Sequence, residues 1–72
     1  MSDAAVLHCQ ELLSIYGYDV DRHGCLDEAT RKVICAFQRH FRPERVDGLP
    51  DASTIGTLED LIAALDERLD VT

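Results

Sequence analysis

Three cysteines and three histidines are the residues of this 72-residue chain that could support redox, metal or nucleophilic chemistry. These residues are Cys9, Cys25, Cys35, His8, His23 and His40. Because the number of cysteines is odd, at least one thiol lies outside any disulfide within the chain. No CxxC or HxxxH pattern is present, so we expect no metal site and no cofactor. Two alternatives stay open: one disulfide, if the chain is exported, and a small zinc-dependent domain.

Asp27 and Asp51 could act as an acid–base pair, but both precede amphipathic segments, where a carboxylate caps a helix. Each aspartate lies in the same pattern, GxxDxxT, over residues 24–30 and 48–54. In this pattern glycine allows the turn, an apolar residue fills the core and Asp caps the helix. The repeat therefore predicts two similar turns from loop to helix, without catalytic chemistry.

Apolar residues at helical spacing predict three helices, over about residues 3–16, 27–41 and 51–69. Gly17 follows the first helix and Pro43 the second, and both residue types end helices. The expected fold class is all-α, a small three-helix bundle with two pseudo-symmetric loop–helix repeats, in a single domain over residues 1–72. Cys9 and Cys35 are expected in or near the core. The expected core residues are Leu12, Leu13, Leu26, Val33, Ile34, Phe37, Phe41, Ile55, Leu58, Ile62 and Leu65.

Charge is distributed unevenly along the chain, whose formal net charge is −7. Residues 31–46 hold five bases and one acid, whereas the rest of the chain holds two bases and thirteen acids. The acidic balance argues against nucleic acid as the main partner, because phosphate contacts need a basic face. No apolar run approaches the ~20 residues that a membrane-spanning helix needs. The N-terminus lacks the basic and apolar regions of a signal peptide, so we expect neither a membrane span nor a signal peptide.

The order of several short motifs resembles the peptidoglycan-binding domain appended to many bacterial cell-wall hydrolases. Residues 13–18 match a first helix that ends in Leu-x-x-x-Gly-Tyr, and residues 36–38 match a central Ala-Phe-Gln. A closing series of Asp-Gly, Asp, Thr and Leu is matched by Asp47, Gly48, Asp51, Thr54 and Leu58. Residues 37–43, followed by Val-Asp-Gly at 46–48, are most similar to the C-terminal domain of N-acetylmuramoyl-L-alanine amidases of the AmpD/AmiD type. The resemblance extends over about residues 7–65.

This resemblance implies a non-catalytic module that binds peptidoglycan and targets an associated cell-wall hydrolase. Hydrolysis is not carried over, because the zinc-binding amidase domain has no counterpart in these residues. The chain would act in the cell envelope or periplasm as part of an exported hydrolase, and in the cytoplasm if Met1 is the native start. The alternative is a protein–protein interaction domain of the same fold in the cytoplasm, which would dock through the basic stretch or the acidic third helix.

Peptidoglycan offers stem-peptide carboxylates, which suit the planar fork of arginine, and sugars, which suit the apolar face and hydroxyl of tyrosine. The candidate ligand-binding residues are therefore Tyr16, Tyr18, Arg39, His40, Arg42 and Arg45. The arginines could equally form surface ion pairs with Glu44 and Asp47, and Tyr16 could belong to the core. Gln38 is expected to hydrogen-bond loop backbone groups with its amide.

Overall fold

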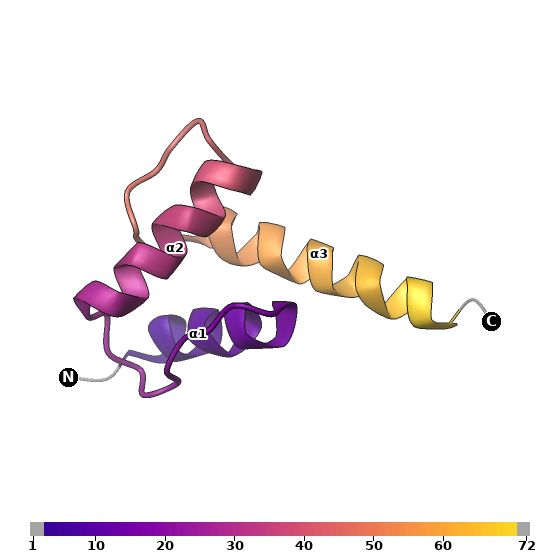
Figure 1. Ribbon diagram of the computed structural model, residues 1–72, viewed down its shortest axis with the longest axis horizontal. Helices are drawn as coiled ribbons and strands as arrows, with labels where there is room; N and C mark the ends of the chain where they lie inside the picture. The colour runs from indigo at the N-terminus through magenta and orange to yellow at the C-terminus, as the bar shows by residue number, and fades with distance from the viewer. Residues whose placement is uncertain (1–2, 71–72) are drawn as a thin grey trace.

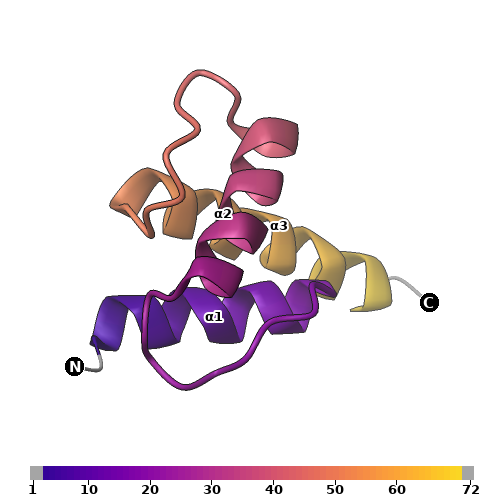
Figure 2. The same ribbon diagram turned by 60° about the vertical axis from the view of Figure 1, so that its left-hand side comes forward.

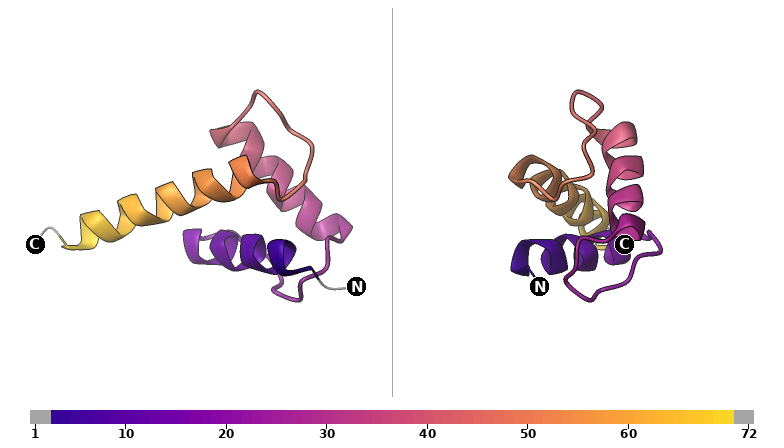
Figure 3. Two further views of the ribbon diagram at one scale, coloured as in Figure 1. Left: turned by 180° about the vertical axis from the view of Figure 1, so that it is seen from behind. Right: turned by 90° about the vertical axis from the view of Figure 1, so that its left-hand side faces the viewer.

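The computed structural model describes residues 3–70, with side chains described for residues 3–66. Its three helices are α1 (Ala4–Tyr16), α2 (Glu28–Phe41) and α3 (Ala52–Asp70), and the described residues contain no strand (Figure 1). Helices α1 and α3 pack on each other, and α2 crosses α1 at a steep angle (Figure 2). The last turns of α3 extend beyond the other two helices (Figure 3). The expected all-α, three-helix fold is confirmed, and each helix begins one residue later than predicted.

Aspartate side chains cap the beginnings of all three helices. Asp3 accepts a hydrogen bond from the Ala5 amide at 2.8 Å. Asp27 and Asp51 accept bonds from the amides of Thr30 and Thr54, also at 2.8 Å. Each bond satisfies a backbone donor that the helix itself leaves unpaired. The capping roles predicted for Asp27 and Asp51 are confirmed.

Two buried glutamines hold the two loops against the helices through the same set of bonds. Gln10 accepts a bond from the Gly24 amide at 2.8 Å and donates to the Thr30 hydroxyl at 2.9 Å and to the Cys25 carbonyl at 3.1 Å. Gln38 accepts from the Gly48 amide at 2.9 Å and donates to the Thr54 hydroxyl at 3.0 Å and to the Leu49 carbonyl at 3.1 Å. Each of these bonds around Gln10 has a counterpart around Gln38, so the two GxxDxxT repeats are pseudo-symmetric.

The structural role predicted for Gln38 is confirmed, and its oxygen also accepts a bond from the Asp47 amide at 3.0 Å. The matching role of Gln10 was not predicted. Gln10 precedes its glycine by 14 residues and Gln38 by ten. This unequal spacing hides the equivalence of the two glutamines in the sequence.

The buried core lies where α1, α2 and α3 meet, and it is formed by Cys9, Leu12, Leu13, Ile34, Phe37 and Leu58. Five other predicted core residues pack against it partly buried, namely Leu26, Val33, Phe41, Ile55 and Ile62. The expectation for Leu65 is wrong, because this residue of the C-terminal half of α3 is 38% exposed. All three cysteines are free, with Cys9 buried and Cys35 partly buried.

Arg42 joins the end of α2 to the beginning of α3. The side chain is buried, and its Nη2 donates to the Thr54 hydroxyl at 2.8 Å and to the Asp51 carboxylate at 3.1 Å and 3.3 Å. The Arg42 amide also bonds to the Gln38 carbonyl at the end of α2. Arg42 therefore fixes both ends of the loop over residues 42–51.

Replacing Gly48 by alanine should lower the free energy of unfolding by about 1–2 kcal/mol, because Gly48 has a left-handed φ of +73°. An added Cβ would also lie 3.0 Å from the Cys35 sulfur and 3.3 Å from the Arg31 carbonyl oxygen. Gly56, in α3, is the matched control, since an added Cβ there meets nothing within 4 Å. Gly56→Ala should raise the free energy by up to about 1 kcal/mol. Urea unfolding measures both, and a Gly48→Ala variant as stable as the wild type would contradict the prediction.

Replacing Arg42 by alanine should lower the free energy of unfolding by about 2 kcal/mol, because the partly buried Asp51 carboxylate would lose its cation. Arg39→Ala is the control, since Arg39 is exposed and such substitutions usually change stability by less than about 0.5 kcal/mol. Urea denaturation of the two variants at equal protein concentration makes the comparison. Equal losses in both variants would mean that the Arg42 contacts contribute nothing specific.

Acid should destabilise the domain through the aspartates of the two loops. Hydrogen bonds from Thr30 hold the pKa of Asp27 below its ordinary value of 3.8, and the Leu49 amide does the same for Asp47. Burial acts to raise the pKa of Asp51, but its bonds with Thr54 and the charge of Arg42 outweigh burial and lower it.

Because the folded pKa values lie below the unfolded ones, these carboxylates stabilise the fold above the unfolded pKa, and the stabilisation is lost as pH falls through the folded values. The urea midpoint should therefore fall steeply below about pH 4. Asp27→Asn should reduce this fall, whereas Asp19→Asn, in an exposed loop position, should not. A midpoint independent of pH in this range would contradict the assignment.

Candidate functional site

The six ligand-binding candidates lie in three different environments. The rings of Tyr16, Tyr18, His40 and Phe41 form a series of contacts, in which Tyr16 meets Tyr18 and Phe41, and Phe41 meets His40. We call these four residues the aromatic rim. Arg39 lines a pocket on another face of α2. Arg42 is buried, and Arg45 lies in the loop that follows α2.

The aromatic rim brings together the end of α1, the second residue after that helix and the end of α2. Tyr16 stacks on Tyr18 with ring centroids 6.3 Å apart. Tyr16 also meets Phe41 in a T-shaped arrangement, with the two ring centroids 5.7 Å apart. His40 stands at 88° to Phe41, with the ring centroids 4.4 Å apart. Two of these rings contact the buried core residue Phe37, with centroid distances of 6.1 Å for Tyr18 and 4.9 Å for Phe41.

Gly17 makes this arrangement possible by ending α1 abruptly. Its φ of 120° turns the chain, and its amide bonds to the carbonyls of Leu13 and Ser14. The Tyr18 amide also bonds to the Leu13 carbonyl, at 2.9 Å. Helices commonly end on glycine with such bonds, because other residues pay a steric cost at positive φ. The turn returns Tyr18 to the side of α1 that faces α2.

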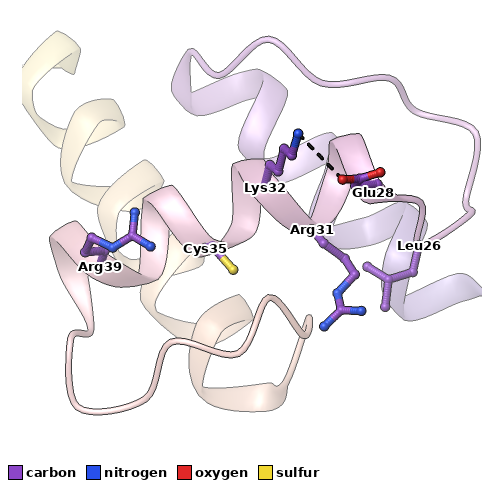
Figure 4. Close-up of a pocket in the computed structure, with 6 residues that line it drawn as sticks. All are labelled: Leu26, Glu28, Arg31, Lys32, Cys35 and Arg39. Atoms are coloured by element: carbon purple, nitrogen blue, oxygen red, sulfur yellow. Dashed lines mark ion pairs between the residues drawn. The ribbon is translucent and has the colours of Figure 1, made fainter.

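The second environment is a basic pocket along α2, beside the loop that follows the helix (Figure 4). The basic pocket is lined by Leu26, Glu28, Arg31, Lys32, Cys35 and Arg39. Glu28 is the single carboxylate among them, and it pairs with Lys32 at 3.7 Å across one helical turn. Three cations and one anion give the pocket a net positive charge in a protein with a net charge of −7.

Helical spacing explains the pocket, since residues 31, 35 and 39 are separated by four positions each and share one face of α2. The loop that follows α2 lies beside this face, because Gly48 has no side chain and packs against Cys35 and Arg31. Arg31 donates to the Asp47 carbonyl of that loop at 3.4 Å. Arg31 and Lys32 were not predicted as site residues, although they belong to the basic stretch of the sequence.

Arg42 does not lie on the exposed surface that was expected for a ligand-binding residue. Its guanidinium lies in the interior and is bound by Asp51 and Thr54, so Arg42 is a structural residue and not part of an exposed ligand surface. Arg45 remains exposed, but its Nε donates to Asp47 at 2.8 Å. For Arg45 the structure thus contains the surface ion pair that the sequence offered as an alternative.

Two general properties of the chain bear on the site. Within residues 3–66, no three His, Cys, Asp or Glu side chains lie close enough together to hold a metal ion. Among the residues that the structure describes, no helix has the length and apolarity needed to cross a membrane.

Comparison with known proteins identifies a family for this arrangement. Residues 2–58 match the family described as "Putative peptidoglycan binding domain". Over 52 residues the chain is 46% identical to N-acetylmuramoyl-L-alanine amidase AmiD of Escherichia coli strain K12. The match covers 72% of this chain and 18% of that amidase, so the chain spans less than a fifth of its relative. No solved structure matches the chain. Because the family match covers most of the 72 residues, the chain belongs to the peptidoglycan-binding domain family.

Proposed function

We propose that this chain is a non-catalytic module that binds peptidoglycan through the basic pocket and keeps an associated cell-wall hydrolase on its substrate. The observation that carries the proposal is the basic pocket itself. It gathers three of the seven basic residues on one face of α2, in a chain with twice as many acids as bases.

The chemistry of the pocket matches the stem peptide of peptidoglycan. Arg31 and Arg39 present planar guanidinium groups, which bind carboxylates through two parallel hydrogen bonds. Leu26 and Cys35 add apolar surface between the cations, which suits the methyl groups of short peptide side chains. The acidic remainder of the chain would repel an anionic ligand elsewhere, so the ligand would be directed to this face.

The association with a hydrolase is supported by the relative, which is an amidase more than five times as long as the matched region. A small domain with an open pocket buries little of its ligand, so we expect modest affinity. Modest affinity is sufficient for a tethered module, because linkage to a polymer with many sites raises the local concentration of the attached enzyme. The module would act where peptidoglycan lies, in the cell envelope. The family match favours this function over a cytoplasmic protein-interaction domain.

The basic pocket can be tested with a soluble muropeptide, a disaccharide that carries its stem peptide. Arg31→Ala and Arg39→Ala should each weaken binding about threefold to tenfold, because each removes one charge-assisted interaction with a carboxylate. Arg22→Ala is the matched control, since Arg22 is exposed in the loop between α1 and α2 and does not line the pocket. Isothermal titration calorimetry measures the dissociation constants. If the three variants bind equally well, the basic pocket is not the binding site.

A further inference from the structure

The rings of the aromatic rim lie at the surface, outside the fully buried core. The core ends at Phe37, which is fully buried, whereas Tyr16, Tyr18 and Phe41 are only partly buried and His40 is exposed. Three of the chain's four Phe and Tyr residues therefore lie at the boundary between core and solvent. No carboxylate or guanidinium group belongs to the rim, which distinguishes it from the basic pocket.

Polar groups accompany these rings. Among the described side chains, neither tyrosine hydroxyl of the rim bonds to another protein group, so both can bond to a ligand or to water. A tyrosine hydroxyl at its ordinary pKa of about 10 is already protonated at neutral pH and able to donate, and burial, followed by the neighbouring Tyr16, raises the pKa of Tyr18 further. A surface with apolar faces and neutral hydroxyl groups is complementary to a sugar ring, which has C–H groups on its faces and hydroxyl groups at its edge.

The rim and the basic pocket border each other on α2. Arg39 lines the pocket and His40 belongs to the rim, and consecutive residues of a helix point about 100° apart. A ligand that follows the surface around the C-terminal half of α2 would meet both. In peptidoglycan the stem peptide is attached directly to a sugar of the glycan strand, so one ligand offers both chemistries side by side.

We propose that the aromatic rim is a saccharide subsite, which packs on the N-acetylated sugars of the glycan strand while the basic pocket holds the stem peptide. This inference rests on the proposed function and adds which part of the polymer each surface contacts. Tyr16 and Tyr18 supply the ring faces and hydroxyl groups, and the exposed His40 supplies a further ring next to Phe41.

The test uses glycan strands freed of their stem peptides, titrated into the ¹⁵N-labelled domain. The strands should shift the amide resonances of residues 16–18 and 40–41 and leave those of residues 31–35 in place. His40→Ala and Tyr16→Leu should each weaken binding of the strands about threefold to tenfold. His8→Ala is the matched control for His40, since His8 is an exposed histidine of α1 outside the rim. Because the shifts are mapped on the wild-type protein, the test stands even if Tyr16→Leu fails to fold.

Three outcomes would overturn the inference. If the peptide-free strands cause no shifts while the muropeptide still binds in an Arg39-dependent way, the saccharide subsite is refuted and the proposed function stands. If an isolated stem peptide, and not the strand, shifts the rim resonances, the two surfaces have been assigned the wrong way round. If neither strands nor muropeptide bind, both the subsite and the proposed function fail.

Discussion

The buried amide of Gln38 is the interaction on which the loop between α2 and α3 depends. Its oxygen accepts the amides of Asp47 and Gly48, and its nitrogen donates to the Leu49 carbonyl and the Thr54 hydroxyl. Without the Gln38 side chain, several buried backbone groups of the loop would be unpaired. Each unpaired group would lower the stability of the fold by roughly 1–3 kcal/mol. Gly48 of this loop packs against Arg31 and Cys35, which line the basic pocket, so Gln38 holds the loop beside the pocket.

The same arrangement explains why the molecule has one basic face. Of the five bases between residues 31 and 46, Arg42 forms an ion pair with Asp51 inside the fold, and Arg45 pairs with Asp47. Arg31, Lys32 and Arg39 remain on α2, next to a loop in which Asp47 bonds with Gln38 and Arg45, and Asp51 caps α3 and pairs with Arg42. The acidic chain therefore keeps a local surface with a net positive charge, although Glu28 pairs with Lys32.

Most of the fold could be predicted from local sequence, because its determinants are local. Asp27 and Asp51 cap the helices that follow them, Gly17 ends α1, and apolar spacing locates the helices within one residue at each start. The GxxDxxT repeat also predicted two similar turns. Leu65 was misplaced because periodicity shows which face of a helix is apolar, but not where the neighbouring helix stops covering it.

The site was less predictable, because it depends on contacts between distant residues. Nothing in the sequence near Arg42 distinguishes it from Arg39, yet one is buried against α3 and the other is exposed in the pocket. The role of Gln10 was not predicted, because its partners lie 14 to 20 residues away in the sequence. Gln10 is also 14 residues from its glycine, whereas Gln38 is ten residues from its own. The grouping of Tyr16, Tyr18 and His40 follows from the crossing of α1 and α2, which one helix alone does not reveal.

The central claim, that this domain binds peptidoglycan, is tested most directly by co-sedimentation of the purified wild-type protein with insoluble sacculi. Cellulose serves as a control for non-specific adsorption, and circular dichroism establishes that the protein is helical. The account predicts that the protein pellets with sacculi and not with cellulose, and that added salt reduces the pelleted fraction by screening the basic pocket. A helical protein that stays in the supernatant with sacculi would contradict the account.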